Sequence, residues 1–208
     1  MKKEIIIDFE TLGVDATSCA VIDCSVVVFE RERFINNPYT LADINNVQRF
    51  KLSVKDQVSN YNSVVESEVI EFWSKQESVV RNKIKPLDSD LTVTDFVNDF
   101  HEIVVANNID YWWSRGNAFD PIILTRLYNS QNMHAQLNGY LKYHKVRDMR
   151  TYIDAKFDFS LKQNGFVPIK DESLWEKSFK LHDSSWDVLA DLLRLQAITR
   201  AENDLELI

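Results

Sequence analysis

Glycine is scarce in this chain: Gly13, Gly116, Gly139 and Gly165 are the only four among 208 residues. Phosphate-binding loops need several closely spaced glycines, because the backbone must approach the phosphates closely. These four are too widely separated to build a P-loop or a dinucleotide-binding turn, and both are therefore excluded. The chain also has no Gly-x-Ser-x-Gly elbow, which disfavours a sheet-based hydrolase with a serine nucleophile.

Cysteine, long apolar runs and positive charge are also limited. Cys19 and Cys24 fall within one predicted strand, where opposite-facing side chains are poorly placed for a disulfide. We expect them to be reduced core thiols of an intracellular protein. No apolar run approaches the roughly 20 residues that cross a bilayer. We expect no signal peptide, because Met1–Glu4 lead directly into a strand, and no membrane partner.

The net charge of −8 has the wrong sign for a protein that coats nucleic acid non-specifically. It remains compatible with an enzyme that binds a few nucleotides through metal ions. The hydrophobic content of 45% and the length of 208 residues predict one globular domain that covers residues 1–208.

The pattern of apolar residues predicts strands that alternate with helices. We expect strands at 5–11, about 19–29, near 33–35, at 109–113 and at 145–149. We expect helices at 66–83, 94–106 and 120–130, and a last helix from Ser184 or Ser185. Residues 156–181 have weak periodicity and are predicted to form a long loop or lid. The order favours an α/β fold with a sheet flanked by helices.

The most informative segment is the first strand, Ile5–Thr11. Its β-branched residues indicate a strand buried on both faces. Asp8 and Glu10 lie two positions apart, so their side chains point to the same face of that strand. Two carboxylates this close repel each other unless a cation lies between them, and hard divalent cations prefer oxygen ligands.

Two later segments carry further candidates. Asp120 stands where the strand at 109–113 passes through a loop into a helix, and it could simply complement the helix dipole. His182 precedes a run of N-cap residues, and Asp187 falls in the first turn of the last helix. This arrangement suits a rigid metal ligand at Asp187 and a mobile base at His182.

The ordered set of these residues resembles the DEDDh family of 3′–5′ exonucleases in the RNase H-like superfamily. Within that family the chain looks similar to the exodeoxyribonucleases of tailed phages. The motifs that carry this resemblance are Ile7-Asp8-Phe9-Glu10-Thr11, Ile70-Glu71-x-Trp73, Arg115-Gly116-x-x-Phe119-Asp120, Arg147-Asp148-x-Arg150-Thr151 and His182-Asp183-Ser184-x-x-Asp187. One departure is Arg115-Gly116, where many members of the family carry His-Asn.

The resemblance implies a DnaQ-like fold with a mixed central sheet, and a site that holds two divalent cations, Mg²⁺ or Mn²⁺. It implies that Asp8 bridges both cations, that Glu10 and Asp187 complete one site, and that Asp120 holds the other. His182 would be the general base, and its ordinary pKa of about 6.5 suits that role near neutral pH.

Substrate contacts are expected from five further residues. By resemblance, the main chain at Thr11 and Leu12 contacts the 3′-terminal nucleotide. Phe119, which precedes Asp120, could contact the terminal base. Arg147 and Arg150 belong to a basic cluster that is either a solvated face or a clamp for the phosphates of the incoming strand. The remaining members of that cluster are Lys142, His144 and Lys145.

The leading hypothesis is therefore a two-metal 3′–5′ exonuclease that releases 5′-mononucleotides from single-stranded DNA. One alternative keeps the mechanism and changes the substrate to RNA or short oligoribonucleotides. A second alternative, from a different class, is an accessory proofreading or binding module held by a polymerase. The sequence does not indicate an oligomeric state.

Overall fold

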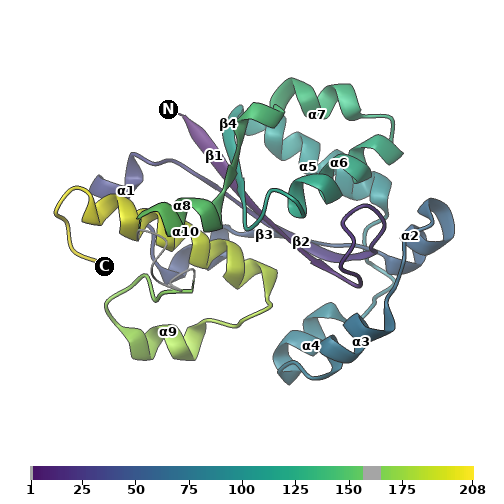
Figure 1. Cartoon of the computed structure of the whole chain (residues 1–208), viewed down its shortest axis with the longest axis horizontal. Helices are drawn as coiled ribbons and strands as arrows, with labels where there is room; N and C mark the ends of the chain where they lie inside the picture. Colours follow the sequence, from purple (N-terminus) through teal and green to yellow (C-terminus); the bar gives the residue numbers. More distant parts are fainter. Residues whose placement is uncertain (1, 157–164) are drawn as a thin grey trace.

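A five-stranded mixed sheet forms the centre of the protein (Figure 1). The structure is a computed structural model and describes residues 2–156 and 165–208. Across the sheet the strands are β3 (Gln48–Lys51), β2 (Val21–Phe29), β1 (Lys3–Thr11), β4 (Ile109–Ser114) and β5 (Val146–Asp148). β1 pairs antiparallel with β2 and parallel with β4, so the first strand lies in the middle of the sheet.

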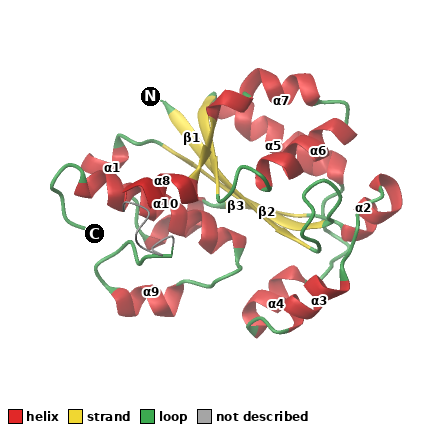
Figure 2. Ribbon diagram, in the orientation of Figure 1, coloured by secondary structure: helices red, strands yellow, loops and turns green. Residues whose placement is uncertain are grey.

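Helices cover both faces of this sheet (Figure 2). One layer contains α5 (Val93–Asn107), α6 (Asp120–Ser130) and α7 (His134–Tyr140). The other contains α1 (Arg33–Asn36), α8 (Met149–Lys156), α9 (Glu172–Ser178) and α10 (Ser184–Ala201). The remaining elements are α2 (Val54–Tyr61), α3 (Ser67–Ser74), α4 (Ser78–Ile84) and the 3₁₀ turns η1 (Leu41–Asn46) and η2 (Tyr143–Lys145).

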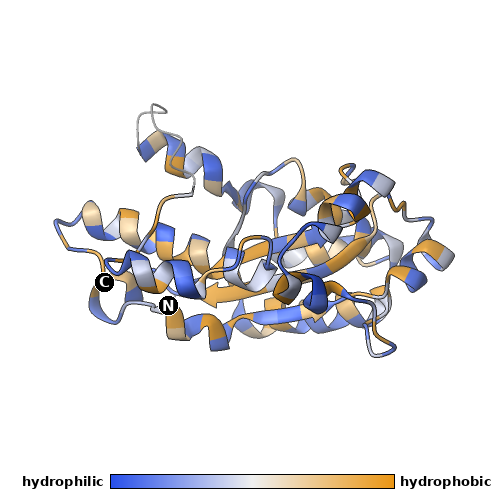
Figure 3. Cartoon of the chain, turned by 90° about the horizontal axis from the view of Figure 1, so that it is seen from below, coloured by the Kyte–Doolittle hydropathy of each residue, from blue (hydrophilic) through white to orange (hydrophobic). Residues whose placement is uncertain are grey.

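Alternation along β1 assigns its side chains to two separate cores. Ile5, Ile7 and Phe9 pack with α5 and α6, whereas Ile6 packs with α8 and α10. Asp8 and Glu10 share the face of Ile6 and are therefore directed to the α10 side. Figure 3 shows largely hydrophobic strands in the middle of the molecule and helices in which hydrophilic and hydrophobic residues alternate.

Helix α10 is unusual because every residue from Val188 to Ile198 is buried, including Asp191, Arg194 and Gln196. Buried polar groups of this kind must be hydrogen-bonded. Gln196 meets this requirement through two hydrogen bonds to the backbone of Tyr39. Its Oε1 accepts from the N–H of Tyr39 at 2.7 Å, and its Nε2 donates to the carbonyl oxygen of Tyr39 at 2.9 Å. No helix in the described part of the chain is long and apolar enough to cross a membrane.

The α/β prediction with a mixed sheet flanked by helices is confirmed, and the helices predicted at 94–106 and 120–130 are present. The predicted strand near 33–35 is wrong, because Arg33–Asn36 form a helical turn that buries Phe34 against α10. The single helix predicted at 66–83 is two helices, α3 and α4, with a break at 75–77. The predicted lid at 156–181 contains helix α9, and its residues 157–164 lie outside the described residues.

Both cysteines are buried and free, as expected, although Cys19 lies before β2 in an isolated bridge to Val64. The elements missed by the sequence prediction are short, and they include β3, α2, α7, α8 and the two 3₁₀ turns. Short elements contain too few residues for a periodic pattern to emerge.

Candidate active site

Three carboxylates meet where β1 approaches the start of α10. Carboxylate oxygens of Asp8, Glu10 and Asp187 all lie within 4.8 Å of one another. Asp8 and Glu10 reach this point because they share one face of β1, and Asp187 because it occupies the first turn of α10. The structure thus brings three of the predicted site residues together.

Asp120 approaches from the other helical layer. It is the first residue of α6, followed by Pro121, whose missing N–H is tolerated in a first helical turn. Asp120 is 5% exposed, and its Oδ1 accepts a hydrogen bond from the backbone N–H of Phe9 at 3.1 Å. It is outside the group of three acids but lines the same cleft, which has a volume of about 610 Å³.

The loop before Asp120 is held by two features. Gly116 has φ +147°, a backbone conformation that side chains rarely adopt. The N–H of Asn117 donates to Oδ2 of Asp148 at 2.9 Å, and the N–H of Thr151 donates to Oδ1 at 2.7 Å. Asp148 thus connects the loop that carries Asp120 to the start of α8.

Crowding and burial disfavour the ionised forms of these acids. Burial, followed by the charges of Glu10 and Asp187, raises the pKa of Asp8 well above its usual value. Burial and the nearby Asp23 do the same for the pKa of Glu10. Burial raises the pKa of Asp120 to about 7 and that of Asp187 to about 7.

The donor set fits hard divalent cations. Asp8, Glu10 and Asp187 offer only carboxylate oxygens, which suit Mg²⁺ or Mn²⁺ rather than softer metals. A cation among these oxygens would relieve the repulsion that raises their pKa values. The pKa shifts and the short spacing therefore point to the same ligand.

His182 also lines the cleft, just before the N-cap of α10. Its backbone has φ 62°, in the left-handed region, and its ring is partly exposed. The imidazole meets the ring of Phe72 edge to face at a centroid distance of 5.0 Å and that of Trp73 at 6.3 Å. Partial burial lowers the pKa of His182, which favours the neutral imidazole at pH 7.

A buried ion network lies one helical turn beyond Asp187. Asp191 accepts hydrogen bonds of 2.9 Å from Nε of Arg115 to both of its carboxylate oxygens. Arg194 donates to the same carboxylate at 2.9 Å and to the carbonyl of Phe166 at 3.1 Å. Arg115 and Arg194 also line the cleft, and their charges lower the pKa of Asp187 against the effect of burial.

Two further ion pairs lie next to the carboxylate group, on β2 and at the start of α10. Asp23 lies opposite Glu10 on β2 and pairs with Arg49. Asp183, the N-cap of α10, pairs with Lys83 from α4. Each pair neutralises a further carboxylate beside the acidic centre, and neither Arg49 nor Lys83 lines the cleft.

The structure brings only some of the predicted substrate-binding residues to the site. Phe119 lines the metal cleft and also an aromatic recess of about 460 Å³, which Thr11 lines as well. Arg150 is exposed and lines the cleft near Asp120. Leu12 instead packs in a small cluster with Trp73, and its N–H donates to Ala20.

Arg147 does not line the cleft. Its guanidinium lies 4.4 Å from the ring centre of Tyr111 and donates to the carbonyls of His144 and Val146. Its position beside Arg150 in the sequence is therefore misleading, because the two residues lie on different elements, β5 and α8.

Sequence reasoning missed Asp191, Arg194 and Phe72. For the first two, a signal was present in the helical spacing Asp187, Asp191, Arg194, at offsets of four and seven, which places all three on one face of α10. No local pattern connects Phe72 to His182, because they are 110 positions apart and meet only through the fold.

Comparisons with known proteins agree with this architecture. The family model described as "3′-5′ exoribonuclease Rv2179c-like domain" matches residues 3–178. His182 and Asp187 therefore lie just beyond the matched segment. The exodeoxyribonuclease of Enterobacteria phage T4 is 28% identical over 218 residues, which cover 98% of this chain and 92% of that protein.

Solved structures with a similar fold include E. coli exonuclease I in complex with a dT13 oligonucleotide, with a TM-score of 0.51 and 14% identity. Exonuclease I from Methylocaldum szegediense has a TM-score of 0.61 and 12% identity. Both alignments cover 98% of this chain but only 41% of the exonuclease I chain. The likeness extends to the mixed sheet and its helical layers, so the predicted RNase H-like fold is confirmed.

Proposed function

The chain belongs to the family of Rv2179c-like 3′–5′ exoribonuclease domains, and from this membership we propose that it hydrolyses single-stranded DNA from the 3′ end with two divalent cations. The coarser activity, a 3′–5′ exonuclease, follows from the family. The proposal further specifies that the substrate is DNA, that two cations are bound, and which residues bind the cations or transfer the proton.

The observation that carries the proposal is the cluster of Asp8, Glu10 and Asp187 within 4.8 Å, with Asp120 in the same cleft. Four acids from two helices and one strand have no structural reason to converge, because their mutual repulsion destabilises the fold. Binding of cations gives that arrangement a function.

The resemblance to DEDDh exonucleases assigns a role to each acid. Asp8 would serve both cations, while Glu10 and Asp187 would complete one site and Asp120 the other. When bound, the cations would activate water and stabilise the charge that develops on the phosphate. His182, neutral near pH 7, would accept the proton of the attacking water.

The two hollows beside the carboxylates differ in chemistry. The aromatic recess is lined by Phe9, Phe72, Trp73 and Phe119 and suits the apolar faces of a terminal nucleoside. The metal cleft is lined by the exposed Arg150, which suits a phosphate, and by Arg115 and Arg194, which Asp191 holds in place. His182 lines both hollows, between the two chemistries.

The preference for DNA rests on the phage T4 relative, an exodeoxyribonuclease that aligns over 98% of this chain. RNA is the second candidate, because the description of the matching family model is that of an exoribonuclease. Discrimination depends on whether the sugar pocket accepts a 2′-OH.

A product analysis tests the proposal. We expect 5′-labelled DNA with Mg²⁺ or Mn²⁺ to shorten stepwise from the 3′ end and to release 5′-mononucleotides. The matched RNA strand should be cut more slowly, and Asp187→Asn should abolish both reactions. Full activity of Asp187→Asn would overturn the site assignment, whereas faster cleavage of RNA would overturn only the assignment of the sugar.

A further inference from the structure

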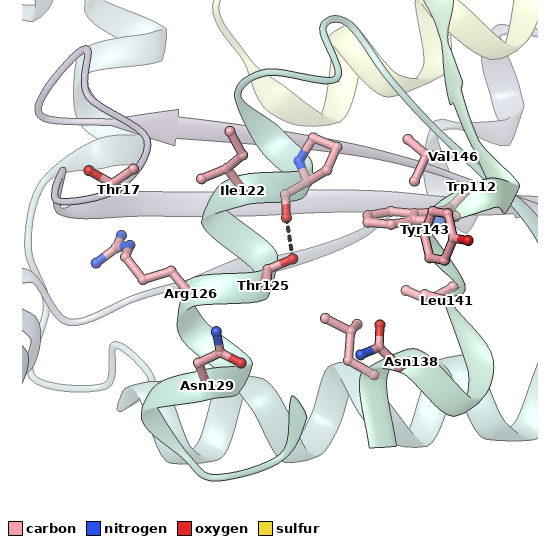
Figure 4. Close-up of a pocket in the computed structure, with 12 residues that line it drawn as sticks. Thr17, Trp112, Ile122, Thr125, Arg126, Asn129, Asn138, Leu141, Tyr143 and Val146 are labelled. Atoms are coloured by element: carbon pink, nitrogen blue, oxygen red, sulfur yellow. Dashed lines mark hydrogen bonds between the residues drawn. The ribbon is translucent and has the colours of Figure 1, made fainter. Parts of the chain in front are cut away.

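A groove on the far side of the α6 N-terminus is not used by the proposed reaction (Figure 4). It has a volume of about 400 Å³ and lies among α6, α7 and η2. Ile122 and Arg126 lie along one side, and Trp112, Leu141 and Tyr143 lie along the other (Figure 4). The size is within the range of pockets that bind small ligands, and a single nucleobase would fit.

Two short segments of the chain line both the groove and the metal cleft. Asp120 lines the cleft, and the next two residues, Pro121 and Ile122, line the groove. On the other side, the short strand β5 connects Tyr143 and Val146 in the groove to Arg150 in the cleft. The start of α6 and the segment around β5 thus each contribute side chains to both hollows.

The charge of the groove is opposite to that of the whole chain. The described residues that line it include Arg126 and no acid, although the chain has 32 acidic residues and a net charge of −8. Lys142 and His144 flank Tyr143, and both are exposed. Lys142 makes no ion pair within residues 2–156 and 165–208, so its charge is available for a phosphate.

Part of the predicted basic cluster is committed elsewhere. Lys145 pairs with Asp110 at 3.6 Å, and Arg147 covers the ring of Tyr111. Of the basic cluster predicted from the sequence, Lys142 and His144 therefore remain beside the groove. Both lie next to the most exposed large hydrophobic side chain of the described residues, Tyr143, which is 84% exposed.

An exposed aromatic ring between two basic residues is costly to leave in water and is the usual platform for an unpaired base. We infer that this groove binds the strand on the 5′ side of the scissile phosphate, with one unpaired base against the ring of Tyr143 and the adjacent phosphates near Lys142 and His144. This inference rests on the proposed exonuclease function and gives the substrate a second point of attachment.

The test compares a short and a long substrate. Tyr143→Ala should raise the KM for an oligothymidylate of roughly 12 nucleotides by about tenfold, because one stacked base is lost. The KM for a dinucleotide, which cannot reach the groove, should not change. Tyr143→Phe retains the ring and should behave as the wild type, and Lys142→Ala should weaken binding of the long strand more at low salt than at high salt.

Two controls separate the possible failures. Lys55→Ala removes an exposed lysine on α2, away from the groove, and should leave the KM of both substrates unchanged. If the wild type cut neither substrate, the proposed function would fail. Fluorescence anisotropy with the labelled long strand would still test the groove. Equal affinity of the wild type and Tyr143→Ala for that strand, or an equal rise in KM for both substrates, would overturn the inference.

Discussion

The indole N–H of Trp73 donates a hydrogen bond of 2.8 Å to the carbonyl oxygen of Thr11, the last residue of β1. The same indole lies edge-on to the imidazole of His182, at 6.3 Å between ring centres. Helix α3 thereby connects the strand that carries two of the acids to the segment that carries the predicted base. Lys83 and Glu77 strengthen this connection through ion pairs with Asp183 and Lys180.

Trp73→Phe should distinguish the effect of the hydrogen bond between Trp73 and Thr11 from the effect of ring packing. The ring is retained, but the buried carbonyl of Thr11 loses its donor, which costs about 1–3 kcal/mol. We expect lower stability in urea and a kcat that falls more than KM rises, because His182 is no longer held against a fixed wall. An NMR titration should show a shift of the His182 imidazole signal, one of only four histidines in the chain.

Lys75→Ala is the matched control for that experiment. Lys75 follows α3 and makes an exposed pair with Glu71, so its removal should change stability by less than about 0.5 kcal/mol. An unchanged His182 signal in Trp73→Phe would show that α3 does not position the base.

The stability of the metal-free protein should fall as pH rises. Asp120 and Asp187 have a pKa of about 7 in the folded protein, whereas an unfolded aspartate has a pKa of about 3.9. Between these values the folded state binds more protons than the unfolded state, so the contribution of these two acids to stability decreases from about pH 4 to pH 7 and then levels off. Thermal unfolding in EDTA at pH 5 to 8 measures this slope.

Two comparisons sharpen the pH experiment. Asp187→Asn cannot ionise and should reduce the slope, so that the variant is more stable than the wild type at pH 8. Mg²⁺ should raise the melting temperature of the wild type at pH 8 more than at pH 6, because the ligands must lose their protons to bind it. A wild-type melting temperature that rises with pH in EDTA would contradict this electrostatic description.

His182→Ala should lower turnover by about 10²–10⁴-fold, the usual contribution of a general base. The residue is not within the group of three acids, so calorimetric binding of Mn²⁺ should be unchanged. A parallel loss of metal affinity would instead identify His182 as a ligand.

Asp191→Asn should destabilise the protein by about 3–5 kcal/mol, as expected when one partner of a buried ion pair is removed. Arg115 and Arg194 would retain two positive charges close together with no carboxylate between them. Chemical unfolding measures the loss, and the exposed pair Lys170–Glu206 provides a control in which Lys170→Ala should have little effect. A loss equal to that of Lys170→Ala would mean that the network contributes nothing to stability.

The central features of the fold and of the acid cluster could be predicted because they depend on local patterns. The alternation in Ile5–Thr11 placed Asp8 and Glu10 on one face, and the N-cap residues at 183–185 placed the start of α10. The strand assigned near 33–35 failed because three residues rich in apolar side chains do not distinguish a strand from a helical turn.

The rest of the site depends on contacts between distant segments. Arg147 and Arg150 look equivalent in the sequence, but only the turn between β5 and α8 decides that Arg150 reaches the cleft and Arg147 covers Tyr111. The contact of Phe72 with His182 requires the α3–α4 segment to fold against the start of α10. No periodicity within either segment contains that information.

The position of Asp187 near the end of the chain determines when the set of acids becomes complete during synthesis. A ribosome that has completed β1, β2, β4 and α6 has made Asp8, Glu10 and Asp120, but not yet the helix that brings Asp187 to them. The nascent chain therefore carries an incomplete carboxylate set, and one face of its sheet lacks the cover of α10. A carboxylate set assembled in this order gains its last acid only when α10 closes the second hydrophobic core.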